Sequence, residues 1–345
     1  MIEIRRDIVD KDIYGRLKYF EENFDIIKNY HLEGSNEIFL GNTDNKVCRF
    51  CGKKEPEVTF EKKAHAIPEL LGNKNLFTYY ECDNCNGKFC KNLEKHLASF
   101  LGISRTLLKV KGKKRIPKYE KGDDEIYVED GRIIIKTSKI NSVLKTYNSD
   151  KKMEITTIKD RYIPIAVYKC FTKMAISIIS DEELEKIDWT IEWVSEKKHK
   201  KSRYSIQPLL LYSAFTPGPS PYTGIDLFLF RRKKLFDYKV PLSYAVPYII
   251  FVIRFKSFVY QIYIEDNSVM YSGKTNRTIK YMSYPGAYDN RHMFGETKYG
   301  VNDVSSKELT KSITENFEFK YEDMIENEEI KKMAEKYIHD KNKSS

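Results

Sequence analysis

The spacing of apolar residues changes several times along the chain, and each change predicts a different element. Between Ile13 and Ile27, apolar side chains recur every three or four positions, which predicts an amphipathic helix over residues 10–30. A short strand followed by a turn is expected over residues 35–45. Helical spacing returns between Phe89 and Phe100. A small helical N-terminus is therefore expected ahead of a cysteine-rich unit that ends in a helix.

Strand-like patterns dominate beyond residue 124. Short runs rich in β-branched and aromatic residues predict strands at 125–128, 132–137, 153–158, 209–214, 226–230, 248–255 and 258–264. The last two runs are close enough to form a hairpin around Lys256-Ser257. Alternation of Ile187, Trp189, Ile191 and Trp193 predicts one more half-buried strand.

Helices are also expected in this region, among them a short one that Ser180 and Glu183 would cap. Pro164 fits the first turn of a helix that continues to about Ile179, because proline at that position loses no needed hydrogen bond. Apolar positions every four residues from Leu309 predict a helix in the C-terminal tail. The predicted fold class is α+β, with four segments: a helical and strand segment 1–44, a cysteine-rich unit 45–102, a basic linker 103–123, and a larger mixed α+β domain 124–345.

Composition narrows the class of protein. The 345 residues are 41% hydrophobic and 13% aromatic, which is not typical of a disordered chain. The formal net charge is +10, which favours polyanionic partners such as nucleic acid. The N-terminus has no apolar signal-peptide core, and the most apolar run, Val240–Phe255, is broken by Pro241, Pro247 and Arg254. We therefore expect a cytoplasmic protein with no membrane partner.

Four of the six cysteines form two identical pairs. Cys48-Arg49-Phe50-Cys51 and Cys82-Asp83-Asn84-Cys85 are both Cys-x-x-Cys turns. Each such turn directs two sulfurs to one point, and four thiolates suit tetrahedral zinc. In a cytoplasmic protein, metal ligation is more typical of such pairs than a disulfide. The spacing therefore predicts a structural zinc site with ligands Cys48, Cys51, Cys82 and Cys85.

The residues around these pairs resemble the HNH endonuclease family, which has the ββα-metal fold. His65 stands in an Ala-His-Ala-Ile-Pro-Glu stretch with Pro68 and Gly72 behind it, and Asn86 directly follows the second cysteine pair. The resemblance covers about 55 residues. It implies that His65 is the general base and that Asn86 binds a catalytic Mg²⁺ or Mn²⁺ through its amide oxygen.

One position departs from the family pattern. Many members carry an acid or a histidine immediately before the catalytic histidine, as a metal ligand, whereas this chain has Ala64. Another ligand is then needed, and Glu69, Glu81 and Asp83 are all possible oxygen donors. Cys90 lies one turn after Asn86, but a thiol is a poor ligand for magnesium.

A basic run follows the cysteine-rich unit. It is formed by Lys109, Lys111, Lys113, Lys114 and Arg115, with no acid among them. Such a run can contact the phosphate backbone of nucleic acid, although it could also be an ordinary solvated linker. Two further basic runs, Lys197–Arg203 and Arg231–Lys234, are interpreted as exposed loops or as secondary nucleic-acid contacts.

The leading functional hypothesis is a metal-dependent endonuclease that hydrolyses DNA. By analogy, a nuclease joined to a large second domain suggests restriction or antiphage defence. Because Ala64 stands where family members carry a metal ligand, a second hypothesis remains open, a catalytically weak zinc module that binds nucleic acid. A third is a nuclease that is silent until residues 124–345 bind a small regulatory ligand or a partner protein, or until the chain forms a homodimer.

Overall fold

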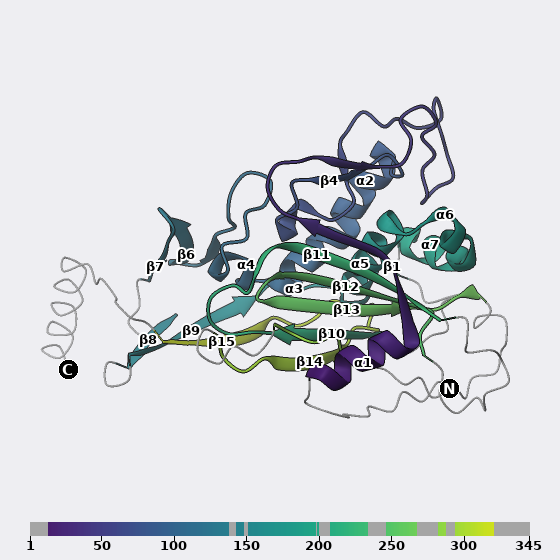
Figure 1. Cartoon of the computed structure of the whole chain (residues 1–345). Helices are drawn as coiled ribbons and strands as arrows, with labels where there is room; N and C mark the ends of the chain where they lie inside the picture. The colour runs from purple at the N-terminus through teal and green to yellow at the C-terminus, as the bar shows by residue number, and fades with distance from the viewer. Residues whose placement is uncertain are drawn as a thin grey trace, which may run out of the picture. The chain divides into compact units, whose positions relative to one another are not determined.

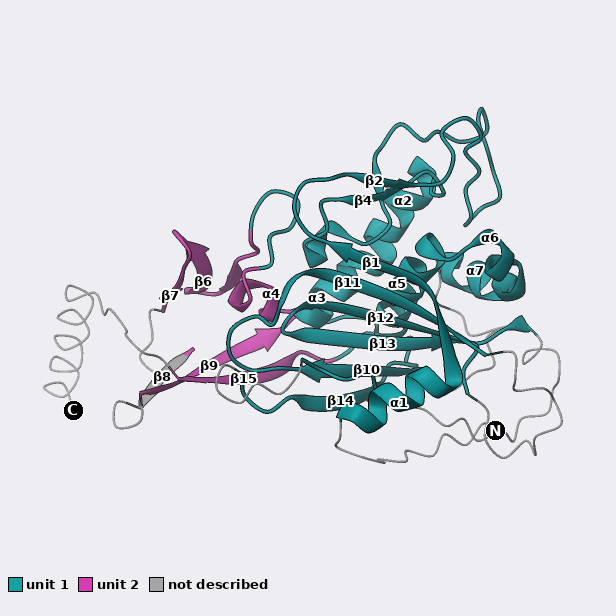
Figure 2. Cartoon of the chain, in the orientation of Figure 1, with its two compact units in different colours: residues 1–101, 110–115, 161–310 teal, residues 102–109, 116–160, 311–345 magenta. Residues whose placement is uncertain are grey.

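The computed structural model gives the chain as two compact units built from the residues it describes, which are 13–137, 143–147, 151–197, 199, 208–233, 246–267, 282–287 and 294–320. Figure 2 colours the units. Unit 1 comprises residues 1–101, 110–115 and 161–310, and unit 2 comprises 102–109, 116–160 and 311–345. The mixed α+β class expected from the sequence is confirmed. The cysteine-rich unit and much of the region beyond residue 161 belong to the same compact unit.

Unit 1 is organised around a six-stranded antiparallel sheet, which Figure 1 shows with its strands side by side. In spatial order these strands are β1 (Phe24–Leu32), β11 (Tyr222–Arg232), β12 (Ile249–Lys256), β13 (Phe258–Ile264), β10 (Leu210–Phe215) and β14 (Lys298–Asp303). The expected hairpin is present, because Phe255 pairs with Phe258. Lys256 takes a positive φ of 54° in its turn.

The core of unit 1 contains a fully buried helix, α5 (Pro164–Ile178). It begins with proline in its first turn, as the sequence predicts, and packs against β12 and β13. A helix that is buried all round needs partners for its polar side chains as well as its apolar ones. The short helices that follow are α6 (Asp181–Leu184), η4 (Glu185–Ile187) and α7 (Asp188–Ser195).

Three sequence expectations are wrong in type or extent. The first helix, α1 (Ile13–Asn23), ends early and the chain continues as β1. The expected strand at 187–193 is α7, because the buried positions Ile187, Thr190, Trp193 and Val194 follow helical spacing once threonine is counted. The expected C-terminal helix is β15 (Ile313–Lys320) over its described part, where every second residue from Glu315 is partly buried.

Residues 38–101 of unit 1, which include nearly all of the cysteine-rich unit, form a small sheet followed by a helical run. The sheet has the order β2-β4-β3. The elements are β2 (Ile38–Leu40), β3 (Ala64–His65), η1 (Glu69–Leu71), β4 (Leu76–Thr78), α2 (Asp83–Phe89), η2 (Cys90–Glu94) and α3 (Lys95–Leu101). The turn η2 is a π-helix, in which the Lys95 amide donates to the Cys90 carbonyl.

The π turn explains a regular burial pattern. Phe89, Leu93, Leu97 and Leu101 are buried at intervals of four residues. In an α-helix such positions drift by about 40° per step. One extra residue in a turn offsets about 100° of that drift. The four side chains therefore stay on one face, although Phe100, which the sequence placed on this stripe, is only partly buried.

The described residues of unit 2 form two small antiparallel sheets and one helical turn. Its elements are α4 (Ser104–Leu107), β5 (Tyr119–Lys121), β6 (Asp124–Glu129), β7 (Arg132–Lys136), β8 (Leu144–Tyr147), β9 (Lys152–Lys159) and β15. Ile103, Ile126, Val143 and Ile155 form its apolar core. Residues 103–123, expected to be a linker, thus contain α4 and β5. Within the described part of the chain, every helix is too short or too polar to cross a membrane.

Candidate functional site

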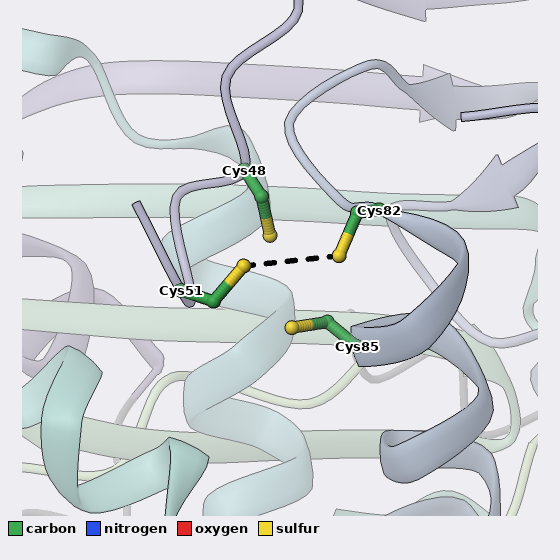
Figure 3. A group of neighbouring side chains, drawn as sticks. All are labelled: Cys48, Cys51, Cys82 and Cys85. Carbon is green, nitrogen blue, oxygen red and sulfur yellow. Dashed lines mark hydrogen bonds between the residues drawn. The ribbon is translucent and has the colours of Figure 1, made fainter. Parts of the chain in front are cut away.

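The four paired cysteines converge on one point, as Figure 3 shows. Their sulfur atoms all lie within 4.8 Å of one another, and Sγ of Cys51 is 3.8 Å from Sγ of Cys82. Tetrahedral zinc with bonds of about 2.3 Å separates its sulfur ligands by about 3.8 Å. Cys48, Cys82 and Cys85 are buried, and Cys51 is exposed. This donor set can hold zinc with all four positions taken by protein.

Local backbone structure brings the two pairs together. Gly52 follows the first pair with a φ of +70° and donates its amide to the Cys48 carbonyl at 2.8 Å, and only glycine enters this region without strain. The second pair stands at the start of α2, where Cys82 is the N-cap. A hydrogen bond from Cys85 lowers the pKa of Cys48 to about 5, while burial raises the pKa of Cys82 to about 11. A bound cation would stabilise all four as thiolates.

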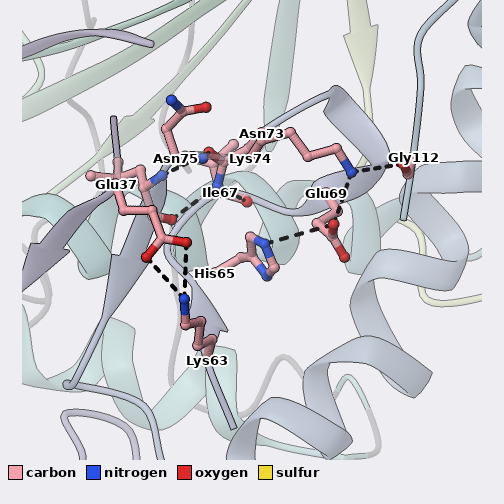
Figure 4. Close-up of polar contacts among 10 residues, drawn as sticks. Glu37, Lys63, His65, Ile67, Glu69, Asn73, Lys74, Asn75 and Gly112 are labelled. Atoms are coloured by element: carbon pink, nitrogen blue, oxygen red, sulfur yellow. Dashed lines mark hydrogen bonds and ion pairs between the residues drawn. The ribbon is translucent and has the colours of Figure 1, made fainter. Parts of the chain in front are cut away.

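His65 ends strand β3, and its side chain is half-buried. Its ring packs against Phe77 with centroids 4.8 Å apart. Figure 4 shows that Nε2 faces Glu69, whose Oε1 is 3.9 Å away. Burial lowers the pKa of His65, and Glu69 opposes the further lowering by Lys173, Lys74 and Lys113. The lowered pKa favours the neutral imidazole, which is the form that can accept a proton.

Asn73 is a site residue that the sequence pattern did not single out. It is 1% exposed, and its side-chain nitrogen donates to the carbonyls of Ile67 and Leu76, at 2.6 and 3.0 Å. Its oxygen accepts from the amides of Asn75 and Leu76. One side chain thus ties together both ends of the loop that follows His65 (Figure 4). Asparagine is common in loops, so its type and position alone do not reveal this role.

Asn86 lies in the first half of α2 and is partly buried. Its backbone amide donates to the Cys82 carbonyl at 2.9 Å, which fixes the Asn86 backbone directly after the cysteine pair. Ala64, at the position where relatives carry a ligand, is 1% exposed and offers no donor. Among the described residues, the cysteines form the one group of three or more histidine, cysteine, aspartate or glutamate side chains spaced to hold a metal.

Two of the three acids proposed to replace Ala64 have other partners. Glu81 is fully buried and pairs with Lys173, with Nζ and Oε2 2.7 Å apart. Asp83 accepts hydrogen bonds from Thr59 and from the backbone amides of residues 61 and 62. Burial would raise the pKa of Asp83, but these bonds lower it overall. Glu69 is the acid that faces His65.

Hydrogen bonds from two side chains connect helix α5 and its C-terminal end to this site. The Lys173 ammonium donates to the His65 carbonyl at 2.8 Å. Arg49, inside the first cysteine pair, donates to the carbonyls of Ile176 and Ile179 at 2.9 and 2.8 Å and stacks on Tyr80. Neither lysine nor arginine carries a recognisable motif here. The sequence therefore did not reveal that both support the site.

Residues 110–115, which we call the basic segment, return to the loop that follows His65. Lys74 donates its ammonium to the Gly112 carbonyl at 2.7 Å, and Val110 is buried beside Gly72. Within the segment Lys111, Lys113, Lys114 and Arg115 are all exposed. Lys113 is close enough to lower the pKa of His65. Lys109 is also exposed but belongs to unit 2, where it donates to Gly131.

The other basic runs contribute less to a charged surface. Arg231 pairs with Glu183 at 2.7 Å and Arg232 pairs with Asp266 at 3.0 Å. These two arginines are therefore engaged within unit 1. Most of the run Lys197–Arg203, and Lys234, lie outside the described residues. Of the two remaining cysteines, Cys170 is buried and Cys90 is exposed.

Comparison with known proteins gives a family match for the segment that carries these residues. Residues 48–101 match the family model described as HNH endonuclease. The match includes both cysteine pairs, His65, Asn73 and Asn86. No curated protein and no solved structure matched the chain.

Proposed function

Since residues 48–101 belong to the HNH endonuclease family, we propose that the protein is a metal-dependent endonuclease that hydrolyses phosphodiester bonds of DNA. The observation that carries the proposal is that a half-buried histidine and an asparagine lie in the same matched segment as a four-cysteine cluster. In this proposal His65 is the general base and Asn86 is an oxygen ligand of the catalytic ion. Zinc at the cysteines is structural, because no position is left for substrate.

Each residue has a defined task in this mechanism. His65 takes a proton from the water that attacks phosphorus. Asn86, on the helix that begins at the cysteines, offers its amide oxygen to Mg²⁺ or Mn²⁺, and oxygen donors suit these hard cations. When bound, such an ion stabilises negative charge on the phosphate and on the leaving oxygen. The exposed basic segment and Lys109 hold the phosphate backbone.

Plasmid cleavage tests the proposal. Purified protein is incubated with supercoiled plasmid and with single-stranded DNA in Mg²⁺, in Mn²⁺ or without added divalent ion. We expect cleavage that needs the ion and that falls at least about 100-fold in His65→Ala, the range that loss of a general base produces. His31→Ala is the matched control, because His31 is an exposed histidine on β1 outside the matched segment. Cleavage that survives His65→Ala would contradict the mechanism.

Ala64 supports one alternative function, a zinc module that binds nucleic acid without cutting it. This alternative predicts DNA binding that is independent of magnesium, with no cleavage by the wild type. A nuclease gated by a regulatory ligand, a partner protein or dimerisation instead predicts cleavage only after such a trigger. A thermal-shift screen with nucleotides would detect a regulatory ligand through the stabilisation that it causes.

By analogy, we extend the proposal to restriction or antiphage defence. Comparing phage plating on cells that carry wild type or His65→Ala tests that extension.

A further inference from the structure

Glu69 contacts His65 through the ring nitrogen Nε2, at 3.9 Å. We propose that Glu69 is the positioning carboxylate of His65, holding the imidazole through its Nε2–H so that Nδ1 accepts the proton of the attacking water. This inference rests on the proposed function and deepens it. It assigns to Glu69 a role as partner of the base, distinct from the role of an ion ligand that the sequence suggested.

The loop fixes Glu69 relative to His65. Glu69 begins the short helix η1, directly after Pro68, and Gly72 ends that helix with a φ of 98°. Asn73 then joins the loop back to the Ile67 carbonyl. The side chains of Glu69 and His65 are each 22% exposed, so water screens their interaction less than it screens a surface pair. A base needs this kind of fixed partner, because the nitrogen that carries a hydrogen is set by what that hydrogen contacts.

Lys74 holds the other side of the carboxylate. Its ammonium lies 2.9 Å from Oε1 of Glu69 and also donates to Gly112 of the basic segment. This contact holds the carboxylate in place beside the ring. Lys74 thereby links Glu69 to the basic segment, which is proposed to hold phosphate. Figure 4 shows this line of contacts from His65 through Glu69 and Lys74 to Gly112.

The charges around His65 give Glu69 a distinct electrostatic effect. Three ammonium groups face the ring, from Lys173 on α5, Lys74 on the loop and Lys113 on the basic segment, and they all lower its pKa. Glu69 is the group that acts in the opposite direction. It stabilises the imidazolium that forms when His65 takes up the proton, as a carboxylate does for a catalytic histidine.

The proton transfer balances with these residues. The O–H bond of water breaks, and its proton goes to Nδ1 while its electron pair forms the new bond to phosphorus. The bond from phosphorus to the leaving 3′ oxygen then breaks, and that oxygen takes the bonding pair and a proton from solvent. Glu69 exchanges no atom. Its carboxylate faces Nε2 throughout, and the attraction between them strengthens as the ring becomes charged.

The first test is the titration of His65 by NMR, in zinc-loaded protein without substrate or added magnesium. We expect Glu69→Gln to lower the pKa of His65 by about one pH unit, because a facing carboxylate is neutralised. Lys74→Met should raise it, because a facing ammonium is lost. Glu37→Gln is the matched control: Glu37, just before β2, pairs with Lys63 at 2.9 Å and not with His65. An unchanged midpoint in Glu69→Gln would overturn the inference.

The second test separates positioning from ion binding. Glu69→Gln should lower kcat at least about tenfold, within the usual contribution of base catalysis, and leave KM and the affinity for Mn²⁺ unchanged. Mn²⁺ affinity is measured by electron paramagnetic resonance without substrate. A weakened Mn²⁺ affinity with kcat restored at saturating Mn²⁺ would identify Glu69 as an ion ligand and overturn the inference. Failure of the proposed function would instead show as absence of cleavage by the wild type.

Discussion

The ammonium of Lys173 lies 2.7 Å from the carboxylate of Glu81, and their side chains are 2% and 0% exposed. Burial raises the pKa of Glu81, and Lys173 opposes that shift. The same ammonium donates to the carbonyl of His65. A buried ion pair is therefore part of the support beneath the strand that carries the proposed base.

Removing Lys173 should destabilise the protein strongly. Lys173→Met leaves Glu81 buried without its counter-charge, which typically costs about 3–5 kcal/mol of unfolding free energy. Urea unfolding measures the difference. Lys169→Met is the matched control on the same helix, because Lys169 is buried but contacts the Trp193 carbonyl rather than an acid. The double variant Lys173→Met/Glu81→Gln should recover part of the loss, and a single variant within 1 kcal/mol of wild type would contradict the prediction.

Replacing a cysteine of the cluster should remove zinc and destabilise the protein, whereas replacing a cysteine outside the cluster should not. Cys48→Ser is expected to lose zinc and to lower Tm by on the order of 10 °C or more, since metal binding contributes directly to folding of such units. Cys90→Ser is the control, because Cys90 is exposed and outside the cluster. Elemental analysis and calorimetry measure both effects. A Cys48→Ser protein that retains one zinc per chain would show that this cluster is not the site.

The basic segment can be tested by the salt dependence of binding. Lys113→Gln should weaken DNA binding about equally for all sequences and reduce the slope of log affinity against log salt by about 1. Fluorescence anisotropy without divalent ions measures this without cleavage. Lys18→Gln on α1 is the control, since Lys18 is also exposed but lies outside the basic segment. Equal slopes for the two variants would show that Lys113 does not contact the DNA backbone.

Stability should depend on pH through His31. Its Nδ1 lies 2.7 Å from Asp226 and its Nε2 lies 3.1 Å from Glu33. Hydrogen bonds to Asp226 and Glu33 raise the pKa of His31. The added stability is therefore fully present below the unfolded pKa of about 6.5 and is lost as pH rises through the raised folded value.

The matching measurement is urea unfolding of wild type and His31→Gln between pH 5.5 and 8.5. The difference should be largest at the acid end, and no more than about 1 kcal/mol because the pair is exposed. A difference that grows toward pH 8.5 would contradict the assigned pairing.

The cysteine cluster was easier to predict than the contacts that support the candidate site. Two identical cysteine spacings predicted the sulfur cluster, since local turns alone direct each pair. Lys173 is more than 100 residues from His65 in the sequence, and nothing in its neighbours marks it as a partner of a backbone carbonyl. Likewise, Glu69 was one of three acids until the fold showed that Glu81 and Asp83 are held elsewhere.

Errors in secondary structure have a common physical origin. Short apolar runs satisfy helix and strand periods almost equally well. Thr190, a polar residue that is buried, completes the helical stripe of α7. In β15, Phe317 and Phe319 alternate with exposed Glu318, but the wider spacing back to Leu309 resembles a helix. The pairing of β15 with β9, more than 150 residues earlier, decides the outcome.

The π turn at Cys90–Glu94 makes the length of this helical run a functional constraint. Deleting any one residue there would restore ordinary α-helical winding and rotate the part before the turn by about 100° relative to the part after it. Leu97 and Leu101 would stay in the core, while Asn86 and the second cysteine pair would turn away from their present direction. The site should therefore tolerate substitutions in this turn far better than a change in the number of residues.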